Sequence, residues 1–122
     1  MKVKSRKWLI READRVFSEH VRKESVKLYK VCPFCLKNPI VDCFHFVTRA
    51  KYSVRWNPLN AVGSCRGCNI RMEFDPHPFI QWFLDNRGGR EAYDALILES
   101  NQTGKFKDKD KLWGVINTFT KN

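Results

Sequence analysis

CPFCLKNPIVDCFHFVTRAKYSVRWNPLNAVGSCRGCN, residues 32–69, begins with one C-x-x-C pair and ends with a second pair followed by an asparagine. The two residues inside each pair allow both thiolates to bind one tetrahedral ion. The 29 residues between the pairs are enough for a β-hairpin, so one ion would join two distant segments and supply folding energy. The pattern therefore predicts a structural zinc site with four ligands, Cys32, Cys35, Cys65 and Cys68.

The alternative roles of these cysteines are redox chemistry and disulfide bonding. A redox dithiol would need a thioredoxin-like βαβ context, which the sequence lacks. The first residues, MKVKSRKWLIREADR, become charged too soon for a secretory signal. We therefore expect a cytoplasmic protein, in which metal binding is favoured over disulfides. The fifth cysteine, Cys43, lies in an apolar pattern and is expected to be a small buried residue.

The composition indicates a basic globular protein. A chain of 122 residues with 43% hydrophobic residues predicts one domain, residues 1–122. The net charge of +10 favours polyanionic partners, with nucleic acid first and an acidic membrane surface second. No apolar run reaches the roughly 18 residues of a membrane span, so no membrane insertion is expected.

Hydrophobic periodicity divides the chain into short elements. Residues 5–29 have apolar side chains at spacings of three and four, which predicts an amphipathic helix. A core over residues 31–75 contains a strand pattern at 40–47 and a helix expected at 65–74. Further helices are expected within residues 78–119, in the segments 78–86, 91–100 and 112–119. These elements together predict the α+β class.

Three polar residues inside the opening stretch form a constellation: His45 ends the strand pattern, Asn60 precedes the second cysteine pair, and Asn69 follows it. This layout, carried by FHFVTRAKYSVRWNPLNAVGSCRGCN and GGREAYDAL, resembles the HNH (ββα-metal) endonuclease family, and most closely the phage NinG (Rap) recombination nucleases. The similarity covers about residues 32–98.

The resemblance implies a small zinc-stapled ββα-metal core, treble-clef-like, with flanking N- and C-terminal helices. It implies an endonuclease that hydrolyses DNA phosphodiester bonds in phage recombination or processing, in the cytoplasm of a bacterial host. In that family, the residue matching His45 activates water, the one matching Asn60 holds the loop that orients the histidine, and the one matching Asn69 binds a catalytic metal.

The residue types suit this chemistry on physical grounds. A histidine with a pKa near neutrality can take a proton from water, and a hard cation such as Mg²⁺ or Mn²⁺ can stabilise charge on a phosphate. One position departs from the family, because Phe44 stands where many members have an acidic residue or a histidine as a metal ligand. Strand alternation turns Asp42 and Phe44 away from His45. The further candidates for the catalytic metal are Glu73, one helical turn after Asn69, and then Asp42 and His77.

Basic residues surround the constellation, and arginine can grip phosphate with a bidentate fork. Phosphate contacts position DNA without reading bases, so we expect binding of branched or duplex DNA that is largely independent of sequence. A homodimer or a complex with phage recombination proteins is possible. The alternative function is a zinc-stabilised nucleic-acid-binding module without catalysis. The expected DNA contacts are Arg55, Arg49, Arg66, Lys51 and Arg71.

Overall fold

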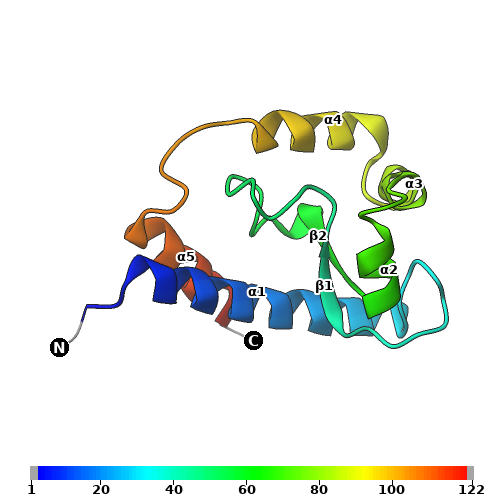
Figure 1. Cartoon of the computed structure of the whole chain (residues 1–122), viewed down its shortest axis with the longest axis horizontal. Coiled ribbons are helices and arrows are strands. Elements are labelled where there is room, and N and C mark those ends of the chain that lie inside the picture. The colour runs from blue at the N-terminus through cyan, green and yellow to red at the C-terminus, as the bar shows by residue number, and fades with distance from the viewer. Residues whose placement is uncertain (1–2, 121–122) are drawn as a thin grey trace.

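The computed structural model describes residues 3–120. Over these residues the chain is an α+β protein with five α-helices, one 3₁₀ helix and one two-stranded sheet. Figure 1 shows α1 running along one side of the β1–β2 hairpin, with α5 against α1 and with α3 and α4 beyond the hairpin. The elements are α1 (Arg6–Tyr29), β1 (Asp42–His45), η1 (Pro58–Asn60), β2 (Ala61–Ser64), α2 (Arg66–Arg71), α3 (His77–Asn86), α4 (Gly89–Ser100) and α5 (Lys109–Thr120).

The elements of the first half lie where the sequence predicts them, with shorter bounds. Ser5 caps α1, because its side chain accepts a hydrogen bond from the backbone N–H of Trp8 at 3.1 Å. The strand predicted over residues 40–47 is only four residues long, since only these four pair with β2 before the chain turns into a loop. The helix predicted over residues 65–74 ends at Arg71. The chain then passes through a turn at residues 72–74 to Pro76, the N-cap of α3.

The second half contains three helices, as the sequence predicts. Helix α3 ends before Gly88, whose φ of 107° lies in the left-handed region that glycine tolerates. Helix α4 begins at Gly89 rather than at residue 91, and α5 is longer than the predicted segment 112–119. None of the helices in the described residues combines the length and apolar character needed to cross a bilayer.

The sheet separates two hydrophobic clusters. On one face, Phe44 and Phe46 pack with aromatic residues of the first cysteine loop and α3, including Phe34, Phe79 and Phe83. On the other face, α1 and α5 form a second cluster that Trp56 and Ala61 join. Side chains of β1 therefore alternate between an aromatic core and the side that faces α1, which is where Cys43 and His45 lie.

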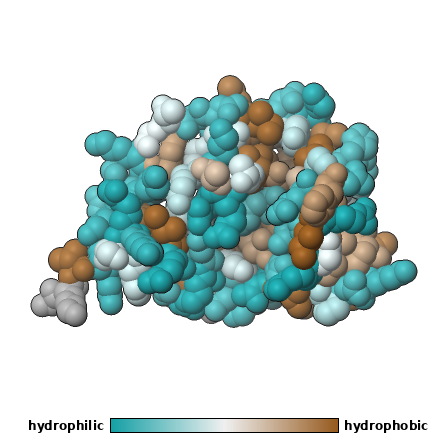
Figure 2. Space-filling view, in the orientation of Figure 1, coloured by the Kyte–Doolittle hydropathy of each residue, from teal (hydrophilic) through white to brown (hydrophobic). Residues whose placement is uncertain are grey.

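A close approach at Gly63 sets the distance between α1 and β2. The Gly63 N–H donates to the hydroxyl of Ser25 on α1 at 2.8 Å. A Cβ at this position would lie 2.9 Å from the Cβ of Ser25 and 2.5 Å from Cγ2 of Ile40. Any side chain there would therefore push α1 away from the sheet. The face of the molecule seen in Figure 2 is mostly polar, with separated hydrophobic spots.

Candidate functional site

The four cysteines of the two C-x-x-C pairs meet in space. The first pair lies in the tight loop after α1, where Leu36 N–H donates to the Cys32 carbonyl at 2.9 Å. Cys65 is the N-cap of α2. The sulfur atoms of all four lie within 4.8 Å of one another, and the Cys35 and Cys65 sulfurs are 3.8 Å apart. Tetrahedral zinc with Zn–S bonds of about 2.3 Å separates its ligands by about 3.8 Å. The cluster can therefore hold a metal ion.

Backbone N–H groups support thiolates in this cluster. The Asn38 N–H lies 3.5 Å from the Cys35 sulfur, and the Cys68 N–H lies 3.4 Å from the Cys65 sulfur. The backbone N–H groups of Asn38 and Lys37 lower the pKa of Cys35 to about 6. Burial instead raises the pKa of Cys68. A bound cation would offset that burial effect, because metal binding and thiol deprotonation are coupled.

His45 lines the second candidate site, a cleft of about 500 Å³ between α1 and the hairpin. Its Nε2 atom lies 2.9 Å from the backbone carbonyl oxygen of Arg55. A carbonyl only accepts hydrogen bonds, so Nε2 carries the proton of the neutral ring and Nδ1 keeps a free lone pair. The ring packs beside Phe17 of α1, with centroids 6.0 Å apart. Burial lowers the pKa of His45, and the hydrogen bond to Arg55 offsets only part of that effect.

Asn60 holds the loop that carries Arg55. The Asn60 side chain is fully buried. Its Oδ1 accepts from the Val47 N–H at 2.7 Å, and its Nδ2 donates to the carbonyls of Val47 and Val54 at 3.1 and 3.2 Å. One amide thus joins both ends of the loop between β1 and η1. The position of the Arg55 carbonyl, and hence the orientation of His45, depends on this bracing.

Replacing Asn60 with alanine is expected to lower the free energy of unfolding by about 2–3 kcal/mol, because buried backbone groups lose their partners. Asn60→Asp should be at least as harmful, since a carboxylate cannot donate to two carbonyls. Urea unfolding of the purified protein measures both changes. The matched control is Asn86→Ala, in which an exposed asparagine is removed and the expected change is below about 0.5 kcal/mol. Equal effects at the two positions would contradict the bracing role of Asn60.

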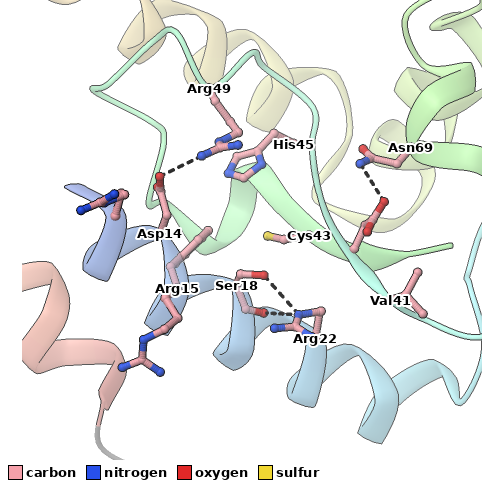
Figure 3. A pocket seen from close by; sticks show the side chains of 12 residues that line it. Asp14, Arg15, Ser18, Arg22, Val41, Cys43, His45, Arg49 and Asn69 are labelled. Carbon is pink, nitrogen blue, oxygen red and sulfur yellow. Dashed lines mark hydrogen bonds and ion pairs between the residues drawn. The ribbon is translucent and has the colours of Figure 1, made fainter. Parts of the chain in front are cut away.

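Asp42 and Asn69 line the same cleft as His45, and Figure 3 shows Asn69 on the side of the cleft away from Arg49 and Asp14. Asn69 Nδ2 donates to Asp42 Oδ2 at 3.2 Å, and Arg66 donates to both carboxylate oxygens at 3.2 and 3.0 Å. Strand alternation predicts that Asp42 faces away from His45, yet Asp42 is among the residues that line this cleft. Asp42 is the first residue of its strand and pairs with Ser64, directly ahead of α2, so its side chain reaches that helix.

The other candidates for the catalytic metal lie elsewhere. Phe44 is fully buried in the aromatic core. Glu73 is exposed in a turn beyond the end of α2, so the prediction that it lies one helical turn after Asn69 is wrong. His77 is exposed at the start of α3, and neither it nor Glu73 lines the cleft. Within residues 3–120, the four cysteines are the one cluster of three or more cysteine, histidine or acidic side chains with converging ligand atoms.

Asp14 of α1 is a site residue that the sequence reasoning missed. Its carboxylate accepts from Arg49 at 2.8 Å, from Arg55 at 3.0 and 2.6 Å, and from the Trp56 indole N–H at 2.9 Å. Burial alone would raise the pKa of Asp14, but the hydrogen bonds and charge of Arg55 outweigh it and lower that pKa. Asp14 thus ties the loop to α1. The one feature of the sequence that could have indicated this role is that Asp14 is an acidic residue next to the apolar stripe of an otherwise basic helix.

Other α1 residues also line the cleft, among them Ser18 and Arg22 (Figure 3). The Nε of Arg22 donates to the Ser18 carbonyl and hydroxyl oxygens at 3.2 and 3.1 Å, which holds its guanidinium beside Ser18. Cys43 of β1 also lines the cleft, from the side opposite α1. Burial raises the pKa of Cys43 to about 12, so its sulfur remains a neutral thiol at pH 7.

The five residues expected to contact DNA divide into two groups. The Arg55 side chain is only 11% exposed and its donors are used by Asp14 and the Arg49 carbonyl, so it braces the loop from inside. The others are exposed. Of these, Arg49 and Arg66 pair with Asp14 and Asp42. Lys51 lies in the loop, and the Arg71 guanidinium lies 5.4 Å from the ring centre of Phe79.

Comparison of the chain with protein-family models, with curated proteins and with solved structures finds no match. Inferences about its chemistry therefore depend on the residues of the two sites and on the sequence resemblance.

Proposed function

We propose that the chain is a divalent-metal-dependent HNH-type DNA endonuclease, in which the four-cysteine cluster binds a structural zinc ion. The observation that carries the proposal is the state of His45. Its Nε2–H donates to a backbone carbonyl, its Nδ1 is left as a base, and its ring lies on a cleft with Asp42 and Asn69. Soft thiolates in a tetrahedral group favour zinc for the cysteine cluster.

His45 would act on the water that attacks phosphorus. Nδ1 of the neutral ring takes a proton from water as the new P–O bond forms, and the bond from phosphorus to the leaving oxygen breaks. The Arg55 carbonyl then stabilises the imidazolium through the Nε2–H hydrogen bond. Because the loop is held by Asn60 and Asp14, the ring keeps one orientation during this step. Burial lowers the pKa of His45 and keeps the ring neutral at pH 7.

Asp42 and Asn69 are the residues that would hold the catalytic Mg²⁺ or Mn²⁺. Their carboxylate and amide oxygens are hard donors of the kind these cations prefer, with water and phosphate oxygens filling the remaining positions. Asp42 accepts three hydrogen bonds, and a carboxylate has about four lone-pair sites, so one remains for a cation. When bound, such an ion supplies charge stabilisation for the pentavalent phosphate and for the leaving oxygen.

The arginines of the cleft support a phosphodiester substrate. Arg22 and Arg49 border the cleft from opposite sides. Their guanidinium groups recognise phosphate oxygens rather than bases, which favours cleavage that is largely independent of sequence. The resemblance to the NinG nucleases extends the proposal to branched DNA in phage recombination.

A cleavage assay tests the proposal. Purified zinc-loaded protein is incubated with branched, duplex and single-stranded DNA in the presence of Mg²⁺ or Mn²⁺. Nicking or cutting of at least one substrate is expected, with the branched form preferred. Loss of the activity after dialysis against metal-free buffer, and its return on adding Mg²⁺, identifies the metal dependence. Absence of cleavage on every substrate with every metal would overturn the proposal.

Asp42→Asn is expected to raise the Mg²⁺ concentration needed for half-maximal cleavage by about ten-fold or more, because an amide replaces the one charged ligand. A Mg²⁺ titration of the cleavage rate measures the change. Asp75→Asn is the matched control, since Asp75 is exposed and lies outside the cleft. If the Asp42 and Asp75 variants gave the same Mg²⁺ dependence, the assignment of Asp42 would be lost.

A second candidate function is a zinc-stabilised nucleic-acid-binding module without catalysis. Two observations favour it: Phe44 is buried in the aromatic core in place of an acidic ligand, and within residues 3–120 no cluster of three or more cysteine, histidine or acidic ligand atoms converges at the cleft. DNA binding without cleavage in any divalent metal, at several pH values, would support this function over the nuclease.

A further inference from the structure

A second cleft lies beside the one that contains His45. It also has a volume of about 500 Å³, and three residues line both clefts: Arg11, Asp14 and Arg49. Its walls come from three segments far apart in the sequence. The first turns of α1 supply Arg6 and Lys7, the loop after β1 supplies Tyr52, and the linker between α4 and α5 supplies Lys107.

The second cleft is strongly positive. Six cationic side chains line it, and the one carboxylate among its residues is that of Asp14. Asp14 is already paired with Arg49 and Arg55. The other four cations form no ion pair within residues 3–120: Arg6, Lys7, Arg11 and Lys107. Like charges held this close repel one another, and a bound polyanion would remove that cost.

Tyr52 organises this cleft. The Arg55 guanidinium lies 4.6 Å from the centre of the Tyr52 ring, and the Lys107 ammonium lies 4.9 Å from it. Cation–π contacts of this kind hold a cation over the ring. The linker lysine is thus fixed beside α1 although about 100 residues separate it from Lys7. The positive charge is therefore placed by tertiary structure rather than by one basic run in the sequence.

The two clefts follow one side of α1. Lys7 lies at the far end of the second cleft, Arg11 lies where they join, and Arg15 and Arg22 lie on the first. At about 1.5 Å per residue, Lys7 and Arg22 are separated by about 22 Å along the helix. About six nucleotides of a DNA strand, at about 3.4 Å each, span the same length. Several successive phosphates of one strand would therefore fit along this side of α1.

We infer that the second cleft binds the DNA backbone on one side of the phosphate that is cleaved, an inference that rests on the proposed function. Lys7, Arg11 and Lys107 contact phosphates there, while His45 acts in the adjoining cleft. A DNA strand would thereby be oriented along α1, so that one phosphate is presented to His45. These contacts read the backbone alone and add no preference for base sequence.

The test uses the double variant Lys7→Ala with Lys107→Ala in the full zinc-loaded chain. Its affinity for a fixed duplex is measured by fluorescence anisotropy over a range of salt concentrations, without added Mg²⁺. The slope of log Kd against log salt should fall by about 0.9 for each phosphate that the variant no longer neutralises, and binding at low salt should weaken several-fold. The control, Lys27→Ala with Arg90→Ala, removes the same charge from exposed positions that line neither cleft.

A second measurement separates this inference from the nuclease proposal. Bis(p-nitrophenyl) phosphate is a small diester substrate that cannot reach the second cleft while it occupies the first. The double variant should therefore lose a larger fraction of the wild-type cleavage rate on DNA than on this diester. Equal salt slopes for the double variant and its control would overturn the inference, even if the protein cuts DNA. An equal loss on DNA and on the diester would also overturn it. If the protein binds DNA without cutting, the nuclease proposal fails, and the salt slopes still decide whether the second cleft binds DNA.

Discussion

His45→Ala is expected to lower the rate of DNA cleavage by about 10²- to 10⁴-fold, the contribution typical of a general base. The remaining activity would come from the metal ion and from substrate binding. DNA affinity should stay near the wild-type value, because the arginines around the cleft are unchanged. The folded state should persist, since the loop beside His45 is held independently by Asn60 and Asp14. Single-turnover cleavage and anisotropy binding measure the two effects separately.

Two further histidine and carboxylate variants serve as controls for this result. His77→Ala and Glu73→Gln alter exposed residues outside the cleft, and both should cut DNA at near wild-type rates. A variant of His45 that cuts DNA as fast as His77→Ala would remove His45 from the mechanism. Loss of activity in Glu73→Gln would instead indicate that Glu73 binds the catalytic metal once DNA is bound.

The pH dependence of cleavage provides a second signature of His45. A general base must be neutral, so cleavage is lost as the pH falls through its pKa. Burial lowers the pKa of His45 below its ordinary value of 6.5, which moves this loss to lower pH. The midpoint of the loss should therefore lie below about pH 6.5, the ordinary value for histidine, and most of the activity should remain at pH 7. His45→Ala should lack this acid limb, and a wild-type midpoint at or above pH 7 would contradict the assignment.

Local signals in the sequence are sufficient for much of the fold. Ligand spacing brings the two cysteines of each pair together, and periodicity places α1 and the C-terminal helices within a few residues of their bounds. The errors lie at element ends, where tertiary contacts decide. The strand stops at His45 because its partner strand begins at Ala61, and α2 stops at Arg71 ahead of the turn toward α3.

The candidate site is less accessible to sequence reasoning, because α1 reaches it only through tertiary packing. Nothing near Asp14 indicates that it meets Arg55, which lies 41 residues away in the chain. The same packing explains why Arg55, one of the five residues expected to contact DNA, is buried instead. Strand alternation predicts that Asp42 faces away from His45, but alternation does not show that Asp42, at the first position of its strand, contacts Asn69 of α2 and lines the cleft.

Cys68→Ser is expected to unfold the chain, because the cysteine cluster joins the segment after α1 to the start of α2 across the sheet. A structural zinc ion, as proposed for this cluster, contributes about 10–16 kcal/mol at pH 7, whereas whole domains are stable by only about 5–15 kcal/mol. Three of the four ligands, Cys32, Cys65 and Cys68, also belong to the aromatic core. Loss of the ion would therefore disturb that core directly. Circular dichroism should show no cooperative unfolding transition, and metal analysis should find less than one zinc per chain.

The fifth cysteine makes a matched control for this experiment. Cys43→Ser changes a free thiol on β1 that is not part of the cluster, so zinc content and cooperative unfolding should be retained. A zinc chelator should reproduce the effect of Cys68→Ser in the wild-type chain, and adding zinc back should restore the fold. Mg²⁺ should not restore it, because thiolates are poor ligands for a hard cation. A Cys68→Ser protein with wild-type melting temperature and zinc content would show that the cluster does not hold the fold together.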